Sequence, residues 1–219
     1  MIPVGSTGGS VYSENNKLYT LSSNPEVRVY GEKLVKVSGQ EYREWNPRKS
    51  KLAAYIKAGG EVFPIKSDSR ILYLGASSGT TASHISDIAV DGKIYCVEFA
   101  PRMFRDLVNT CAARPNMIPI LGDATDPEGY QFAVGLLDLV YADVAQKRQA
   151  EIIANNMDFF NADMGMVAIK ARSEDVASEP SEVYKASENK LRERGFEILD
   201  SRDLEPYENA HSMMVIKRK

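Results

Sequence analysis

In this 219-residue chain, three apolar segments end in an acidic side chain or are directly followed by one. They are Glu98, Asp123 and Asp143. The carboxyl ends of strands in an open α/β sheet meet at one edge, where ligands bind, so we expect these carboxylates to line one crevice. A carboxylate there can accept hydrogen bonds from both ribose hydroxyls of an adenosine, as expected of Glu98, or from an adenine amino group, as expected of Asp123.

A glycine turn precedes these carboxylates. The apolar run 71–74 predicts a buried strand, Gly75 to Gly79 predict a turn, and the apolar spacing over Thr80–Val90 predicts a helix. The free N–H groups of the first helical turn would face a ligand held in this turn. The turn has the spacing G-x-x-x-G and contains no lysine or arginine, whereas a pyrophosphate site has the spacing G-x-G-x-x-G. This difference favours S-adenosylmethionine, which has no phosphate, over NAD. A packing role for the glycines is the alternative.

The candidate cofactor-binding residues come from the turn, the helix start and the strand ends: Gly75, Ala76, Ser77, Thr80, Thr81, Glu98, Phe99, Asp123, Ala124, Asp143, Val144, Ala145 and Gln146.

Lys170 ends another apolar run, and Asp143 ends the run that we expect to lie beside it. A lysine at the end of a buried strand needs a carboxylate partner to offset its desolvation. The pair can be a structural ion pair, or it can deprotonate an acceptor. Burial favours the neutral amine and the carboxylate favours the ammonium, and the sequence leaves both interpretations open.

Strands that alternate with helices predict a mostly parallel sheet covered on both faces. No helical pattern separates the last two predicted strands, so we expect them to pair antiparallel. This is typical of the Rossmann-like fold of class I S-adenosylmethionine-dependent methyltransferases, with a seven-stranded sheet. The predicted strands are 71–74, 93–98, 117–121, 136–142, 165–170, 196–200 and 212–216.

The first 45 residues have a different pattern. Short β-favouring runs separated by turn residues predict an antiparallel meander with strands at Val11–Tyr12, Lys17–Leu21, Val27–Tyr30 and Lys33–Val37, after a start over 1–10 that is frayed apart from Ile2 and Val4. A helix over 48–58 would follow, with Asn46 as its N-cap and Pro47 at its first position. We therefore expect a small β-rich domain over 1–45 and a catalytic domain over 46–219.

The formal net charge is −3, which argues against a free-standing nucleic-acid binder, although clustered cations such as Arg43 to Lys51 leave room for a local basic face. No run approaches the roughly 20 apolar residues of a membrane span, and the N-terminus is too polar for a signal peptide, so we expect an intracellular protein. Cys96 and Cys111 are expected to be buried thiols rather than a disulfide or metal site.

Taken together, the strand ends resemble the archaeal branch of the fibrillarin family, the fibrillarin-like ribosomal and transfer RNA 2′-O-methyltransferases. The matching segments, WNPRKSKLAA, LGASSGTTASHISD, VEFAPR, GDA, YADVAQ and IKAR, run in order through the chain. Two details differ from the family pattern. Ser77 stands where an alanine is common, and Asn209 with Ala210 precedes His211 where a charged pair is commoner.

The resemblance implies a catalytic set of Lys51, Asp143, Lys170 and His211. It also implies in-line methyl transfer from S-adenosylmethionine to a ribose 2′-hydroxyl, in the processing of rRNA and tRNA, with Lys170 as the base. From the residues alone, Lys51 would be a solvated helix lysine and His211 a loop residue, and His84 would have a packing role.

The resemblance further implies partners. A box C/D guide RNA would pair with the substrate RNA, a Nop-domain scaffold protein would hold the enzyme, and a kink-turn-binding ribosomal-type protein would anchor the RNA. It implies a cytoplasmic location in an archaeal cell, and neither a metal nor a membrane takes part. Two other functions stay open: a methyltransferase for a small molecule or protein, and a non-enzymatic subunit that only scaffolds RNA.

Overall fold

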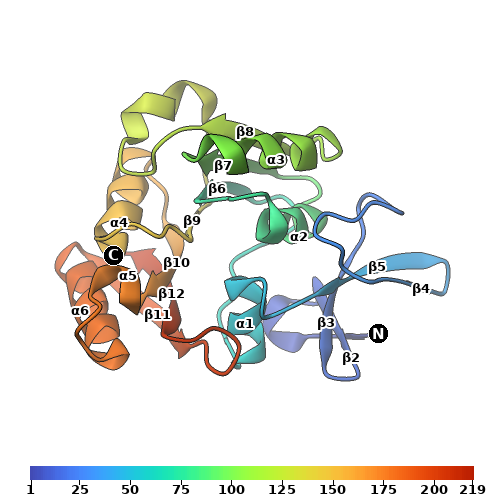
Figure 1. The fold of residues 1–219 in the computed structure, drawn as a ribbon, viewed down its shortest axis with the longest axis horizontal. Coiled ribbons are helices and arrows are strands. Elements are labelled where there is room, and N and C mark those ends of the chain that lie inside the picture. Colours follow the sequence, from blue (N-terminus) through green and yellow to red (C-terminus); the bar gives the residue numbers. More distant parts are fainter.

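A computed structural model describes all residues, 1–219, and contains two sheets that lie side by side (Figure 1). The larger has seven strands in the order β11-β12-β10-β9-β6-β7-β8. All its neighbouring strands are parallel except β12, which runs antiparallel to both β10 and β11. The strands are β6 (Arg70–Leu74), β7 (Lys93–Glu98), β8 (Met117–Leu121), β9 (Leu139–Ala142), β10 (Met164–Lys170), β11 (Phe196–Asp203) and β12 (His211–Arg218). The predicted fold class is confirmed.

Helices cover both faces of this sheet and divide the core into two layers. One layer packs α1, α2 and α3 against the sheet, and the other packs α4 and α6 on the opposite face. Because both faces are covered, the central strands β6 and β9 are buried along almost their whole length. The helices are α1 (Lys51–Lys57), α2 (Thr80–Ile88), α3 (Pro101–Ala112), α4 (Gln149–Phe159), α5 (Ala171–Glu174) and α6 (Pro180–Glu193).

The smaller, antiparallel sheet has the order β1-β2-β3-β5-β4. Its strands are β1 (Ile2–Pro3), β2 (Val11–Glu14), β3 (Lys17–Leu21), β4 (Leu34–Val37) and β5 (Gln40–Trp45). The meander is therefore present, but three details of the prediction are wrong. Residues 27–30 are irregular, residues 40–45 form a strand that pairs with both β3 and β4, and residues 1–10 hold β1 and the short 3-10 helix η1 (Gly5–Thr7).

Residues 27–30 miss the sheet because Glu32 binds their backbone instead. Its carboxylate accepts the N–H groups of Val29 and Tyr30 at 3.1 and 2.9 Å, which replaces ladder hydrogen bonds. The predicted boundary after Trp45 coincides with the end of β5, and the division into two domains stays a prediction.

Several helices and strands also begin or end at other residues than predicted. Helix α1 begins at Lys51 rather than 48, because the Ser50 hydroxyl accepts the Ala53 N–H and acts as the N-cap in place of Asn46. Helix α2 stops at Ile88, and β9 starts at Leu139 instead of 136. The 3-10 helix η2 (Pro127–Ala133) and the four-residue α5 carry no periodic apolar pattern and were not predicted.

A buried charge cluster joins the two sheets. Arg43 of β5 donates to Glu32 at 2.6 Å and to Asp87 of α2 at 2.6 Å, and Arg114 donates to the other oxygen of Asp87 at 2.7 Å. All four side chains are at most 1% exposed. Arg43 therefore does not belong to the surface cluster of cations that the sequence suggested.

His84 of α2 belongs to the same interface and has the packing role that was predicted. It is fully buried and stacks on Trp45, with ring centroids 4.7 Å apart. Burial, reinforced by Arg43 and Arg114, holds the pKa of His84 well below its usual value, so the imidazole is neutral. Both cysteines are buried free thiols, as predicted, and no helix is long and apolar enough to cross a membrane.

Candidate active site

A cavity of about 300 Å³ opens at the carboxyl ends of β6, β7, β8 and β9. All four strand ends expected to bind a cofactor contribute to it, and Lys170 at the end of β10 also lines it. Its lining residues are Gly75, Ser77, Val97, Glu98, Phe99, Ala100, Met103, Gly122, Ala124, Asp143, Val144, Ala145, Gln146 and Lys170.

The glycine turn forms the floor of the cavity because the backbone there comes very close to its neighbours. At Gly75, which has φ +76°, a Cβ would lie 2.8 Å from the carbonyl oxygen of Asp143. At Gly79, with φ +90°, a Cβ would lie 2.9 Å from Thr110. Ser77 between them also has positive φ, 51°. Only glycine fits the two outer positions without strain. Gly75 brings bare backbone to the cavity, whereas Gly79 lets the turn pack against α3.

Glu98 ties this turn to the start of α3. One carboxylate oxygen accepts the Ser77 N–H at 2.8 Å, and the other accepts the Ala100 N–H at 2.8 Å. The side chain is buried yet lines the cavity. Each carboxylate oxygen can accept a second hydrogen bond, so Glu98 keeps an acceptor on each oxygen for a pair of vicinal hydroxyls.

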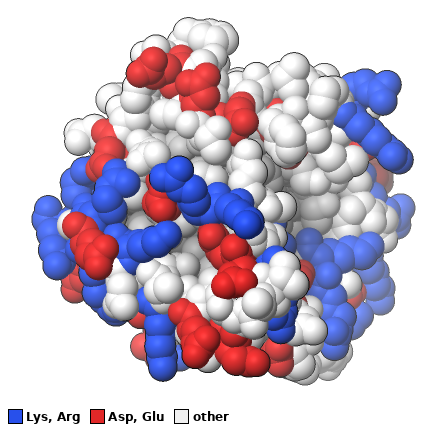
Figure 2. All heavy atoms as spheres, turned by 60° about the vertical axis from the view of Figure 1, so that its left-hand side comes forward, with Lys and Arg blue, Asp and Glu red and all other residues white.

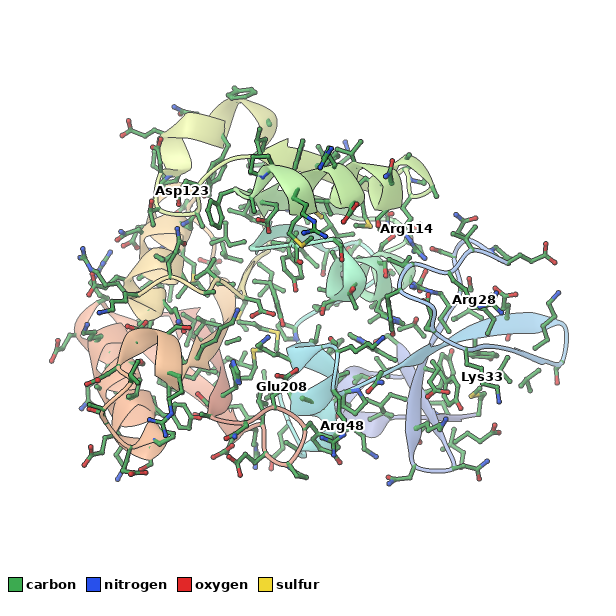
Figure 3. The ribbon with its side chains drawn as sticks, viewed as in Figure 1. Arg28, Lys33, Arg48, Arg114, Asp123 and Glu208 are labelled. Carbon is green, nitrogen blue, oxygen red and sulfur yellow. The ribbon has the colours of Figure 1, made fainter.

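Asp123 lies at the rim, in the loop between β8 and η2 (Figure 3). It accepts hydrogen bonds from the Thr125 N–H at 2.9 Å and from the Gln146 side-chain amide at 3.1 Å. The Thr125 N–H, with a smaller contribution from Gln146, holds the pKa of Asp123 below its usual value. Asp123 itself does not line the cavity, whereas its neighbours Gly122 and Ala124 do.

Three other predicted residues do not reach the cavity. Ala76 and Thr80 are absent from its lining, and Thr81 points toward α1, where its hydroxyl donates to Ser50 at 2.9 Å. Conversely, the sequence prediction missed Val97, Ala100, Met103 and Gly122 as lining residues. Met103 could have been found from its position in the first turn of the helix that starts just after Glu98.

Two lysines flank Asp143 at the open end of the cavity. The Nζ of Lys170 lies 2.8 Å from Oδ1 of Asp143 and 3.0 Å from its backbone carbonyl oxygen. The Nζ of Lys51, in the first turn of α1, lies 3.2 Å from the same Oδ1. All three side chains are about 15% exposed, so the cluster contacts solvent, and Asp143 and Lys170 also line the cavity.

His211, the fourth member of the predicted catalytic set, pairs with Lys170 in the ladder between β10 and β12. Its Nδ1 lies 2.7 Å from the carbonyl oxygen of Asn209 and 3.9 Å from the carboxylate of Glu208. Burial, reinforced by Lys51, lowers the pKa of His211, so the ring is neutral near pH 7. A neutral ring that donates Nδ1–H to Asn209 leaves Nε2 as an acceptor.

The cavity fits S-adenosylmethionine. Glu98 offers acceptors for two hydroxyls, the glycine turn admits a ligand against its backbone, and no lysine or arginine in that turn demands a phosphate. Beside the cavity, Lys51, Asp143 and Lys170 can position a nucleophile. The strand order and this crevice are those of the class I methyltransferases, which use S-adenosylmethionine.

Within that class, the chain belongs to the fibrillarin family, whose family model matches residues 9–219. Its relatives include the fibrillarin-like rRNA/tRNA 2′-O-methyltransferase of Methanothermobacter thermautotrophicus, 50% identical over 95% of this chain and 94% of the relative. The protein of the same name from Methanopyrus kandleri is 55% identical over 85% of this chain and 82% of the relative.

Solved structures agree with this family. The Methanococcus jannaschii fibrillarin pre-rRNA processing protein has a TM-score of 0.89 and 50% identity, covering 92% of this chain and 89% of its own. Aeropyrum pernix fibrillarin, solved with natively bound S-adenosyl-L-methionine, has a TM-score of 0.85 and 49% identity, with 91% and 88% covered. A fibrillarin from a complex with Nop5p has a TM-score of 0.87 and 40% identity, with 96% and 98% covered.

Proposed function

We propose that this chain transfers the methyl group of S-adenosylmethionine to a ribose 2′-hydroxyl of ribosomal RNA, and also of transfer RNA. One observation carries the proposal: Lys51 and Lys170 flank Asp143 at the open end of a cavity whose floor is a glycine turn fastened by Glu98. The names of its relatives, rRNA/tRNA 2′-O-methyltransferases, and the cofactor in Aeropyrum pernix fibrillarin support it.

In the proposed reaction, Lys170 removes the proton of the 2′-hydroxyl. The O–H bond breaks, the proton moves to Nζ of Lys170, and the oxygen lone pair forms the new bond to the methyl carbon. S-adenosylmethionine supplies an electrophilic methyl whose bonding electrons return to sulfur. A positioned general base contributes about 10²–10⁴-fold, and alignment of the two reactants can contribute about 7–11 kcal/mol.

The other polar groups would orient the acceptor. Oδ1 of Asp143 lies 2.8 Å from Nζ of Lys170 and 3.2 Å from Nζ of Lys51, and Lys51 also donates to Oδ2 at 3.3 Å. Asp143 would therefore hold the base beside the cavity. Lys51 carries a charge that suits the ribose phosphate. Neutral His211 offers Nε2 as an acceptor for a hydroxyl of the same nucleotide.

The proposed setting is a ribonucleoprotein in which a box C/D guide RNA selects the target, a Nop-domain protein holds the enzyme and a kink-turn-binding protein anchors the RNA. The solved complex of a related fibrillarin with Nop5p supports the scaffold. With a net charge of −3, the surface is not generally basic; Figure 2 shows Lys and Arg in separate groups with Asp and Glu between them. Weak RNA binding by the isolated chain is expected. The proposed location is the cytoplasm, where rRNA and tRNA function in a cell without a nucleus.

The test is transfer of labelled methyl to guided RNA by the complex reconstituted with Nop-domain and kink-turn-binding proteins. Lys170→Ala should lose transfer by at least about 10²-fold, while S-adenosylmethionine binding in calorimetry changes little. Lys217→Ala, an exposed lysine in β12 far from the crevice, is the matched control and should stay active. Comparable turnover in Lys170→Ala would end the assignment of the base, and an inactive wild-type complex would end the proposed function.

A further inference from the structure

A second cavity, of about 320 Å³, lies where the small sheet meets the segment that leads into α1, and none of the proposed catalytic residues lines it. Lys17 of β3, Lys33 just before β4 and Lys49 just before α1 all line this cavity, which we call the lysine pocket. Helix α1 itself lies between the two sheets (Figure 1). Three ammonium groups around one hollow repel each other, so the pocket attracts negative charge.

The carboxylates of the lysine pocket are already engaged. Glu32 and Glu44 are the acidic residues that line it. Glu32 is buried and accepts a hydrogen bond from Arg43 at 2.6 Å, so its charge is neutralised from the protein interior. Glu44 lies 2.9 Å from Nζ of Lys17 and neutralises that lysine. The other two lysines of the pocket therefore keep an uncompensated charge.

Lys33 and Lys49 are these uncompensated cations. Both are exposed and neither forms an ion pair, and Nζ of Lys49 lies 5.4 Å from the centroid of the Tyr30 ring. Asn46 adds a third donor, because its side-chain oxygen accepts the Arg48 N–H at 2.9 Å while its amide nitrogen makes no hydrogen bond. Two ammonium groups and one amide around a single hollow suit an oxyanion.

The wall of the lysine pocket is held by hydrogen bonds that leave these ammonium groups free. The Glu44 N–H donates to the carbonyl of Lys33 at 2.9 Å and fixes the backbone that carries this lysine. The Tyr30 hydroxyl donates to the Glu44 carbonyl at 2.9 Å, and the Glu32 carboxylate accepts the Tyr30 N–H at 2.9 Å. A ligand therefore meets a backbone that is already ordered, so its binding costs little ordering of the chain.

The lysine pocket adjoins the catalytic lysines. Lys49 precedes Lys51 by two residues, which span at most about 7 Å of backbone, and Nζ of Lys51 lies 3.2 Å from Asp143. An RNA strand whose ribose reaches Asp143 and Lys170 carries a phosphate on each side of that ribose. We propose that the lysine pocket binds a backbone phosphate of the substrate RNA close to the methylated nucleotide. This inference rests on the proposed function.

The chemistry of the pocket favours RNA over an acidic protein segment. Protein interfaces have a core from which charged residues are depleted, whereas Tyr30 is the only apolar or aromatic residue that lines this pocket. Phosphate contacts, in turn, come largely from lysine and arginine. Because the chain as a whole has a net charge of −3, two uncompensated lysines beside the active site give a local positive face without making the surface generally basic.

The experiment measures single-turnover methyl transfer by the reconstituted complex to substrate RNAs in which one phosphate at a time, on either side of the target nucleotide, is a neutral methylphosphonate. In the wild type, one such replacement should slow transfer by about ten-fold, the effect of losing a hydrogen bond to a charged group. The double variant Lys33→Gln, Lys49→Gln should slow transfer to the unmodified RNA by a similar factor. The same methylphosphonate should then add little, because the two changes remove one contact.

Three controls accompany the double variant. Lys49→Arg keeps the charge and should stay near the wild type. Lys93→Gln removes an exposed lysine at the amino end of β7, on the sheet edge opposite the crevice, and should change neither the rate nor its sensitivity to methylphosphonates. The double variant should bind S-adenosylmethionine and the Nop-domain protein as the wild type does.

An active wild-type complex in which no methylphosphonate slows transfer, or losses that simply add in the double variant, overturns the inference. Failure of the double variant to assemble with the Nop-domain protein would overturn it in favour of an acidic protein segment as the occupant. An inactive wild-type complex would instead overturn the proposed function.

Discussion

The protein contains two clusters of charged side chains that have nearly the same composition but different roles. In each, one aspartate lies between two cations: Asp87 between Arg43 and Arg114, and Asp143 between Lys51 and Lys170. The Asp87 side chain is fully buried where the two sheets meet, whereas the Asp143 side chain is 14% exposed at the open end of the cavity.

The choice of cation explains the difference. The arginine guanidinium stays charged in proteins and presents several donors in a fixed fork, so Arg43 can bind Glu32, Asp87 and Ser83 at once. Lysine carries one compact ammonium that can lose its proton. The cluster around Asp87 is therefore suited to hold two sheets together, and the cluster around Asp143 is suited to exchange a proton with a substrate.

The largest effect should come from removing Asp87. Asp87→Ala leaves Arg43 and Arg114 buried without this counter-ion, and breaking a buried pair in this way costs about 3–5 kcal/mol. Urea unfolding of the isolated chain measures the loss. Asp91→Ala, an exposed position just beyond the same helix, should change the free energy of unfolding little. A loss below about 1 kcal/mol for Asp87→Ala would mean that the cluster does not hold the sheets together.

The corresponding change in the other cluster should affect activity instead. Asp143→Asn keeps the shape of the side chain but removes the charge that holds both lysines. Transfer to guided RNA should fall by about 10²–10³-fold, or about 2.7–4 kcal/mol, the usual cost of losing one electrostatic group at an active site. The free energy of unfolding should change less than in Asp87→Ala.

Asp163→Asn is the matched control for this change, because Asp163 is exposed at the opposite end of β10. It should retain activity. If Asp143→Asn instead unfolded the protein as strongly as Asp87→Ala, the distinction between a structural and a reactive cluster would fail.

The sequence predicted one of these clusters far better than the other. Asp143 and Lys170 follow apolar strands, and the rule that ligands bind at the carboxyl ends of parallel strands places them together. Lys51 and His211 came only from the family resemblance, because a helix lysine and a loop histidine have no local pattern. The mostly parallel sheet with an antiparallel final pair followed from the alternation of strands and helices, whereas the order of the strands was not predicted. The family model that matches residues 9–219 confirmed the family.

The Asp87 cluster was missed for a physical reason. Arg43 lies among polar residues in a short strand, and nothing local distinguishes a buried arginine from a solvated one. Its burial depends on Glu32, Asp87 and Arg114, which are distant in sequence and meet only when the two sheets pack. Residues 27–30 leave the sheet because of a local contact instead, in which the carboxylate of Glu32 accepts the N–H groups of Val29 and Tyr30.

A smaller effect should appear in the pH dependence of stability. Burial alone would raise the pKa of Asp87, but Arg43 and Arg114 outweigh it and the pKa lies below its usual value. The stabilisation is therefore complete above the unfolded value near 3.8 and is lost as the pH falls through the folded value. The wild type should lose about 1.4 kcal/mol of its free energy of unfolding for each pH unit by which the folded pKa of Asp87 lies below the unfolded pKa. Below about pH 5, the free energy of unfolding should fall less steeply with decreasing pH in Asp87→Asn than in the wild type. Equal slopes in the two proteins would contradict this role of Asp87.

The smallest effect should come from Thr20, which supports the buried cluster through one hydroxyl. Its Oγ1 donates to Asp87 at 2.9 Å and lies 2.8 Å from Nδ1 of His84. Thr20→Val keeps the volume but leaves Nδ1 of His84 without this hydrogen bond, whereas Asp87 still accepts from Arg43 and Arg114. The free energy of unfolding should therefore fall by only about 1 kcal/mol. Thr20→Ser keeps the hydroxyl and should fall less. Methyl transfer at a permissive temperature should be unaffected in both variants, and a selective loss of activity would show that the two clusters are coupled through α2.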